Sequence, residues 1–443
     1  MQALVGAEVD LLVLGAGIAG VTAARRLAGR CSRTLILEAA DAVGGVAGTF
    51  AVGDFRFDYG LHCFFTAFPH IEKLLDEVMA GRHARRPLTE KVWHRDAWYP
   101  YPVTRNLAAY PADVIGKALA DLPQGPPSPA GDAAAASEAA VGSYLAHEFV
   151  LPQLRKYWNS DPAGLPAGVA RAGFMATADE IRAGAVQGLD DPPTRSWSYP
   201  ADGGFATYVA GLADGLPIRY ATSATRIDPA ARTVRTADGQ RFHYRHLVSS
   251  IPLPRLLAMV DGAPPELVDR TAALTFTSVR LVSLGVTAAD TPASWVYDLD
   301  PRVPWFRATF PGEYSPGSVP PGSAAIQTES YFVGTPTTGD DQHADEVVTS
   351  LRRRGLLPDS ASVICRDVRT VTCASTILHP AEAPAVQTAI DWLSSQDITT
   401  VGRYGRWDNA KFDVVMARTE QLLDGRPVVT AEKGSESDGA QRS

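Results

Sequence analysis

The sequence predicts an α/β fold in which three separate segments of the chain form one largely parallel sheet. Four apolar runs have the length and composition of buried strands: residues 9–14, 34–37, 247–251 and 398–401. A turn and a helical pattern separate the first two runs, which is the strand–turn–helix–strand order of a Rossmann-type unit. We therefore expect three segments, 9–60, 218–254 and 398–424, to form a split Rossmann-type domain.

The turn after the first run carries a G-x-G-x-x-G motif whose glycines are Gly15, Gly17 and Gly20. The first glycine permits the tight turn, the second lets the backbone approach a pyrophosphate, and the third lets helix and strand pack closely. The N–H groups of the following helix, which begins near Ala19, favour phosphate. Glu38 ends the second run, where a carboxylate would accept hydrogen bonds from ribose hydroxyls. The unit predicts a bound dinucleotide, and a purely structural turn is the alternative.

Composition limits the class of protein. The chain has 443 residues and a net charge of −8, so nucleic acid and anionic membranes are not expected partners. No apolar run reaches the roughly 18 residues that a membrane span needs. The 4 cysteines are scattered, which fits a reducing compartment and indicates neither a metal site nor a disulfide framework. We expect a cytoplasmic protein, and the sequence leaves its oligomeric state open.

The remaining patterns divide the chain into six parts. Helical patterns at 143–158 and 168–188 indicate a mostly helical insertion, strand patterns fill 278–335, and Asp238-Gly239 is a hairpin signal. The expected parts are dinucleotide-binding (1–66, 199–260 and 397–430), a helical substrate insertion (67–198), a β-rich substrate domain (261–396) and a disordered tail (431–443).

A second glycine pair, Gly44-Gly45, lies a few residues beyond Glu38. It suggests another close approach of backbone to an extended cofactor, which an NAD site does not need, although a plain turn is the alternative. The split order of the domain is also typical of flavoproteins. Together these features favour FAD as the dinucleotide.

Several segments then share one resemblance. They are Phe57–Phe65, Trp98–Pro102, Lys156–Trp158, Tyr199–Gly204, Trp295–Tyr297, Pro304–Thr309, Tyr314–Pro316 and Gly402–Trp407. In order and spacing they resemble the UDP-galactopyranose mutases, most of all the eukaryotic type, within the amine oxidase and protoporphyrinogen oxidase superfamily of FAD proteins. The resemblance covers about residues 9–425. It implies a split FAD-binding domain with a helical insertion and a β-sheet substrate domain.

The resemblance also implies an activity. Mutases of this family interconvert the pyranose and furanose forms of a nucleoside-diphosphate sugar, with N5 of reduced FAD as the nucleophile at the anomeric carbon. The implied partner is therefore a nucleoside-diphosphate sugar. NADPH or NADH is the implied reductant, since the flavin has to be kept reduced.

The resemblance assigns roles to individual residues. The implied catalytic residues are His62, Arg171 and Arg307. The two arginines match a diphosphate clamp, because guanidinium groups bind phosphates bidentately, although an ordinary ion pair is the alternative. His62 matches a histidine on a loop against the flavin, and an unperturbed imidazole titrates near neutrality. The implied substrate contacts are Phe65, Trp295, Tyr297 and Tyr314, and the implied cofactor contacts beyond the glycine motifs and Glu38 are Ala224, Arg403 and Trp407.

Part of the family pattern is missing. Ser375 and Asn409 stand where the eukaryotic-type mutases carry two tyrosines against the diphosphate, and Gln153 and Leu154 replace other substrate contacts. Each lost phenolic donor would cost roughly 1–1.5 kcal/mol if nothing replaced it. We therefore expect a substrate other than UDP-galactose. Two alternatives remain open: an FAD-dependent oxidase or dehydrogenase of the same superfamily, and a flavin-binding protein without catalysis.

Overall fold

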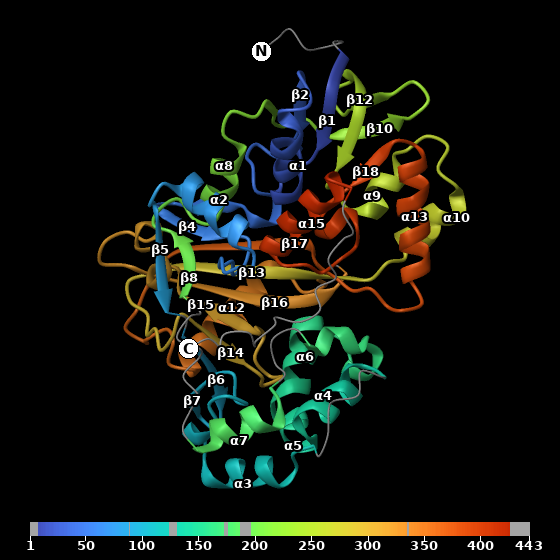
Figure 1. Cartoon of the computed structure of the whole chain (residues 1–443). Coiled ribbons are helices and arrows are strands. Elements are labelled where there is room, and N and C mark those ends of the chain that lie inside the picture. The colour runs from blue at the N-terminus through green and yellow to red at the C-terminus, as the bar shows by residue number, and fades with distance from the viewer. Residues whose placement is uncertain are drawn as a thin grey trace, which may run out of the picture.

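Three layers make up the molecule, with the N-terminal sheet and its helices at one end, a second sheet in the middle and a group of helices at the other end (Figure 1). This computed structural model describes residues 8–87, 89–123, 131–171, 176–186, 196–334 and 336–425, with only the backbone at residues 171 and 196. The tail expected at 431–443 lies outside the described residues.

The first sheet confirms that separate segments of the chain share one sheet. Its described strands run in the order β10 (Ala224–Asp228), β11 (Thr233–Thr236), β12 (Arg241–Ser249), β1 (Glu8–Leu14), β2 (Thr34–Leu37) and β9 (Ile218–Arg219), and β18 (Ile398–Thr400) pairs with β12. β1 is parallel to both neighbours, with Val13 between Val248 and Ile36. The turn at Asp238-Gly239 joins the antiparallel strands β11 and β12, as predicted.

Helices cover both faces of this sheet, because side chains alternate along each strand. Leu11 and Val13 of β1 pack on one face, and Leu12 and Leu14 on the other. The first face is covered by α1 (Ile18–Ala28), α2 (Pro69–Met79), α8 (Ala206–Ala213) and α15 (Phe412–Leu423). The second is covered by α9 (Leu253–Ala258), α10 (Pro265–Ala272) and α13 (Ala383–Ser395). The last helix, α15, lies within the expected third segment, 398–424.

The second sheet lies in the middle of the molecule and confirms the β-rich region. Its described strands run in the order β17 (Val363–Thr376), β13 (Phe276–Val286), β16 (Ala324–Val333), β15 (Arg307–Thr309), β14 (Trp295–Asp298), β6 (Glu90–His94) and β7 (Ala97–Pro100). Only β14 and β6 pair in parallel among them. Helix α12 (Asp340–Arg353) packs on it, as does the hairpin of β3 (Thr49–Val52) and β4 (Phe55–Asp58).

The segment 67–198, expected to be a mostly helical insertion, contains helices and also four strands that were not predicted: β5 (His83–Pro87), β6, β7 and β8 (Ser196–Pro200). They are four or five residues long. β6 and β7 pair with each other in a hairpin, whereas β5 pairs with β8, and β6 also pairs with β14, far along the chain. Local patterns carry no such signal. The described helices of the insertion after α2 are α3 (Ala112–Ala120), α4 (Ala133–Val141), α5 (Ser143–Leu145), α6 (Leu151–Trp158) and α7 (Ala178–Val186).

The helices predicted within the insertion have mixed outcomes. Residues 143–158 are helical throughout, since a π-helical turn at Ala146–Val150 joins α5 to α6. The helix predicted from 168 to 188 is shorter, because only a 3-10 helix at Ala167–Arg171 precedes α7 and residues 172–175 and 187–188 are outside the description.

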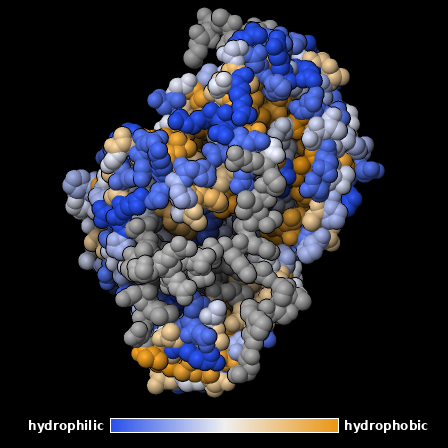
Figure 2. All heavy atoms as spheres, in the orientation of Figure 1, coloured by the Kyte–Doolittle hydropathy of each residue, from blue (hydrophilic) through white to orange (hydrophobic). Residues whose placement is uncertain are grey.

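On the face shown in Figure 2, apolar side chains gather at the end of the molecule formed by α3, where Leu119 is exposed. The rest of this face is mainly hydrophilic. No helix among the described residues is long and apolar enough to cross a membrane.

A buried cluster of charges joins the middle sheet to the helices beside it. Arg354, which follows α12, bonds Asp298 at 2.6 Å and Asp300 at 3.0 Å. The Lys156 ammonium of α6 donates to the carbonyls of Asp300 at 2.9 Å and Val303 at 3.1 Å, and burial lowers its pKa to about 8. Asp298 is completely buried, so its charge depends on Arg354.

We expect Arg354→Ala to lower the free energy of unfolding by about 3–5 kcal/mol, because it leaves the Asp298 carboxylate buried without its partner. Arg302→Ala is the matched control, since Arg302 also bonds Asp300 but its side chain is 85% exposed. The control should cost at most about 1 kcal/mol. Urea unfolding measures both, and equal losses would contradict the assignment.

Candidate functional site

A cavity of about 510 Å³ lies at the carboxyl ends of the parallel strands β1, β2 and β12. In open α/β sheets this edge is where ligands bind. The three returning segments all contribute to the walls, and a fourth wall comes from β17 of the second sheet. The lining includes residues 14, 15, 17–19, 37–39, 44–47, 222–224, 250–252, 370–373 and 402–404, with Tyr59, His62, Arg255, Ala410, Phe412 and Val415.

The glycine motif has the geometry that the sequence predicted. Gly15 has φ +95°, which side chains rarely adopt. A Cβ on Gly20 would lie 1.9 Å from the Gly15 carbonyl oxygen, so α1 starts in direct contact with the turn after β1. The pair Gly44-Gly45 lies against this motif, since the Gly44 N–H donates to the Ala16 carbonyl at 3.0 Å and Gly44 pairs with Gly17 in a β-bridge. Gly15, Gly17, Gly44 and Gly45 therefore present backbone without side chains to the cavity.

Glu38 lines the cavity and also holds the glycine turn in place. Its carboxylate accepts from the backbone N–H groups of Ala16 at 2.6 Å and Ala40 at 2.8 Å. The Glu38 carbonyl accepts from Thr222, which brings the segment containing Ala224 to the same end of the cavity. Glu38, the expected ribose contact, therefore also accepts two hydrogen bonds from backbone N–H groups.

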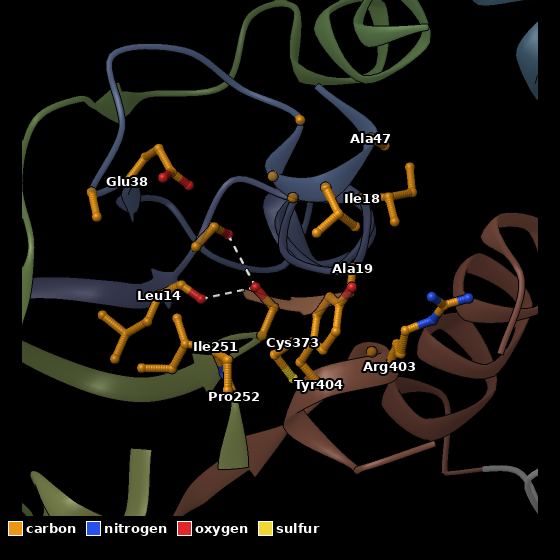
Figure 3. A pocket seen from close by; sticks show the side chains of 18 of the residues that line it. Leu14, Ile18, Ala19, Glu38, Ala47, Ile251, Pro252, Cys373, Arg403 and Tyr404 are labelled. Carbon is orange, nitrogen blue, oxygen red and sulfur yellow. Dashed lines mark hydrogen bonds between the residues drawn. The ribbon is translucent and has the colours of Figure 1, made fainter. Parts of the chain in front are cut away.

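The residues present fit an extended dinucleotide. Helix α1 begins at Ile18, and its N-cap Gly17 provides no side-chain cap, so the first N–H groups lie at the cavity end of the helix without an intrahelical partner. Figure 3 shows Leu14, Ile251 and Pro252 around one part of the cavity and Ile18, Ala19 and Ala47 around another. The Ser250 hydroxyl donates to the Leu14 carbonyl at 3.0 Å, so it fixes the edge of β12 against β1 (Figure 3).

His62 lines the far part of the cavity. Its Nδ1 lies 3.0 Å from the Gly60 carbonyl, and since a carbonyl only accepts, Nδ1 carries the proton. Burial lowers the pKa of His62 to about 4, and the charges of Arg403 and Arg307 act in the same direction. The imidazole is therefore neutral at pH 7, with Nε2 as a hydrogen-bond acceptor. The expectation of a group titrating near neutrality does not hold in this environment.

Glu329 connects the His62 loop to the second sheet, and the sequence analysis missed it. Its side chain is 1% exposed and accepts from Leu61 N–H at 2.6 Å, Arg307 at 2.6 Å and the Tyr331 hydroxyl at 2.7 Å. One carboxylate on β16 thus ties the loop beside the cavity to the arginine expected to hold a diphosphate. No local pattern marks a single glutamate in a strand.

Arg307 starts β15 with a largely buried side chain. Burial disfavours its charge, but the Glu329 carboxylate keeps the pKa of Arg307 well above its usual value. Its Nε atom is buried without a partner among the described residues. Tyr297 lies nearby and accepts from Trp295 Nε1 at 2.9 Å. Three of the predicted residues are therefore brought together on β14 and β15.

The other predicted residues lie apart from this group. Tyr314 packs on Tyr199 with ring centroids 4.8 Å apart, the Lys411 ammonium lies 4.8 Å from the ring centroid of Phe65, and buried Trp407 donates to the Ile377 carbonyl. Like Arg307, Tyr297 and Trp295, these residues do not line the cavity. Arg171 ends a 3-10 helix, and its side chain lies outside the described residues.

Arg403 lines the cavity, but its guanidinium donates to the carbonyls of Ala410 at 2.9 Å and Ala374 at 3.1 Å. It points away from Glu38 and Leu14 in Figure 3. The guanidinium is thus held by main-chain carbonyls, and the role of Arg403 as a cofactor contact stays a prediction.

The departures from the family pattern also have defined places. Buried Ser375 shares a hydrogen bond with the Tyr157 hydroxyl at 3.2 Å. Gln153 accepts from the Tyr101 hydroxyl at 2.8 Å, and its Nε2 is buried without a partner among the described residues. Asn409 is exposed. Two of these positions thus meet tyrosines from other elements.

Comparison with solved structures gives the same fold. Reduced UDP-galactopyranose mutase superposes with a TM-score of 0.86 at 21% identity, over 94% of this chain and 93% of that one. Cyclohexylamine oxidase from Brevibacterium oxydans IH-35A superposes with a TM-score of 0.61 at 15% identity, over 94% and 100%. The chain has the α/β fold of flavin-dependent mutases and oxidases. Residues 13–78 match the family model of an NAD(P)-binding Rossmann-like domain.

Sequence comparison finds oxidases and desaturases. Coproporphyrinogen III oxidase of Mycobacterium tuberculosis H37Rv is 25% identical over 312 residues, 62% of this chain and 66% of that protein. The chain therefore matches just under two thirds of that oxidase. A 15-cis-phytoene desaturase of an Oncidium hybrid cultivar is 37% identical over 71 residues, 16% of this chain and 12% of that protein. These likenesses support the dinucleotide site and leave the reaction open.

We expect Gly20→Ala to abolish flavin retention, because the added Cβ would lie 1.9 Å from the Gly15 carbonyl and force α1 off the turn. Gly29→Ala at the other end of α1 is the matched control, since a Cβ there meets nothing within 4 Å. The absorbance ratio of flavin to protein after purification measures the effect. Normal flavin content in the Gly20 variant would contradict the close contact.

Two buried groups predict opposite pH effects on stability. The pKa of His62 is lowered from 6.5 to about 4, because the buried ring favours the neutral form. The contribution of the neutral ring to folding stability is therefore present above pH 6.5 and is lost as pH falls toward 4, since the unfolded chain takes up the proton first. Burial raises the pKa of Asp58 from 3.8 to about 6, so its contribution is present below pH 3.8 and is lost as pH rises toward 6.

We therefore expect His62→Gln to gain stability relative to the unmodified protein as pH falls from 6.5 to 4, and Asp58→Asn to gain as pH rises from 4 to 6. Urea unfolding at each pH measures the differences. Curves that run parallel to the unmodified protein would show that neither group titrates as assigned.

Proposed function

We propose that the chain is a flavin-dependent mutase that interconverts the pyranose and furanose forms of a nucleoside-diphosphate sugar. The observation that carries the proposal is Arg307, held by Glu329 beside the His62 loop with its Nε unpartnered among the described residues. A buried guanidinium among phenol groups suits an anionic substrate, whereas an amine or polyene has no use for it.

The residues of this chain would then divide the work of binding and proton handling. A reduced flavin bound in the cavity would supply the nucleophile for the anomeric carbon. Arg307 would bind the diphosphate as it leaves and hold it for return, through the Nε–H that has no partner among the described residues. His62 Nε2, as an acceptor on a neutral ring, would orient a sugar hydroxyl.

Burial of the site supports the same proposal. The aromatic groups Tyr297, Phe306 and Tyr331 pack around Arg307, with Tyr297 and Phe306 centroids 5.2 Å apart. They limit water around a cation, and electrostatic attraction to a diphosphate is stronger where water is excluded. The changed contacts at Ser375, Gln153 and Asn409 support a substrate other than UDP-galactose.

The second candidate is an FAD-dependent oxidase or dehydrogenase. The Arg307 charge is already paired by Glu329, so the described part of the site carries little excess positive charge for a diphosphate. The sequence relatives named as oxidases and desaturases agree with this reading. Such an enzyme would consume an oxidant, which a mutase does not.

We expect the dithionite-reduced protein to interconvert the ring forms of at least one nucleoside-diphosphate sugar, with UDP-galactose as the first probe and chromatography as the readout. NADPH and NADH would be compared as reductants. Arg307→Lys should lower kcat/KM by roughly 10–100-fold, since a lost charged hydrogen bond is worth about 1.5–3 kcal/mol, and it leaves Glu329 a cationic partner.

Arg366→Ala is the control, because Arg366 is a surface residue paired with Asp341 and Asp345 in the same domain. It should leave kcat/KM unchanged. Hydrogen peroxide release with an amine or a porphyrinogen, together with no change of ring form, would favour the oxidase instead. Flavin binding without either reaction would favour a protein without catalysis.

A further inference from the structure

A second, smaller cavity of about 40 Å³ lies between α14 (Gly402–Gly405) and α15. It is next to the dinucleotide cavity, because Gly402, Arg403, Ala410 and Val415 line both. Nothing in the proposed reaction uses this space. Its remaining lining residues are Val401, Arg406, Asp408, Arg418, Thr419 and Leu422.

The lining carries three arginines and one carboxylate. Arg418 pairs with Asp408, and Arg403 donates to main-chain carbonyls. The side chain of Arg406 is partly buried, yet it makes no hydrogen bond or ion pair within the part of the chain that the structure describes. The cavity therefore has an excess of positive charge.

The positive charge of Arg406 disfavours the positive charge of Arg418. Burial lowers the pKa of Arg406, with the nearby Asp391 carboxylate acting in the opposite direction, and burial together with the charge of Arg406 lowers the pKa of Arg418. Like charges this close in a partly buried site destabilise the folded chain unless an anion lies between them. Arginine is also the side chain best suited to bind an oxyanion, through paired N–H groups.

A second observation also indicates a ligand. Thr419 is 2% exposed, lines the cavity, and its hydroxyl has no partner among the described residues. A buried hydroxyl without a partner costs about 1–3 kcal/mol. An oxygen in the cavity would satisfy this donor as well as Arg406.

We propose that this cavity, between Arg406, Arg418 and Thr419, is a binding site for a small tetrahedral oxyanion of the phosphate class. The volume suits an anion of a few heavy atoms and excludes a nucleotide. The site is independent of the reaction proposed above, since it depends on charge and an unpartnered hydroxyl and not on the sugar pocket.

We expect the flavin-loaded protein to bind inorganic phosphate with one site per chain in calorimetry, at ionic strength held constant with chloride. Arg406→Gln should weaken the affinity for phosphate at least about tenfold, which is the loss expected for one charged hydrogen bond. Thr419→Val, which keeps the volume, should weaken it about two- to tenfold. Glycerol 2-phosphate would be compared, because binding of the ester as well would indicate the phosphate group of a larger molecule.

Stability separates a binding role from a structural one. Without phosphate, Arg406→Gln should have a Tm no lower than the unmodified protein, because it removes repulsion; with phosphate, its Tm should be the lower of the two. Arg302→Gln, at a side chain 85% exposed, is the control and should keep the full phosphate response. A phosphate response retained in Arg406→Gln, or a Tm lowered in phosphate-free buffer, would overturn the proposal.

Discussion

The contact between Gly20 and the Gly15 carbonyl is the constraint on which the site depends. No side chain fits between α1 and the turn after β1, so the start of the helix is held against the edge of the sheet. The second glycine pair packs on the first, and Gly402 packs on Ala19, where a Cβ would lie 2.4 Å away. The first and third segments of the split domain thus meet through nearly bare backbone, which leaves the cavity open to a dinucleotide.

The link between the two halves of the molecule is electrostatic. Glu329 on the second sheet holds the His62 loop through Leu61 and pairs with Arg307. The same buried environment lowers the pKa of His62 and fixes its proton on Nδ1. A substitution that changes the Arg307–Glu329 pair therefore also changes a contact of the loop beside the cofactor cavity, because the same Glu329 carboxylate bonds Leu61.

Charge balance distinguishes the parts of the molecule. The cluster around Asp298 and Arg354 is matched and buried, and it supports the fold. Arg307 is matched by Glu329 but keeps one unused donor. The cavity beside α15 has more arginine charge than carboxylate charge. The second and third arrangements leave polar groups that a bound anion would satisfy.

The sequence by itself determined the split sheet, the glycine turns and the position of Glu38, because each depends on local spacing and on the freedom of glycine backbone. Tertiary structure decided the rest. The pairing of β6 with β14 and of β8 with β5 joins strands that are far apart along the chain, and Glu329 acquires its role only where three segments meet. Burial, which no local pattern encodes, moved the pKa of His62 away from neutrality and left Arg406 beside Arg418.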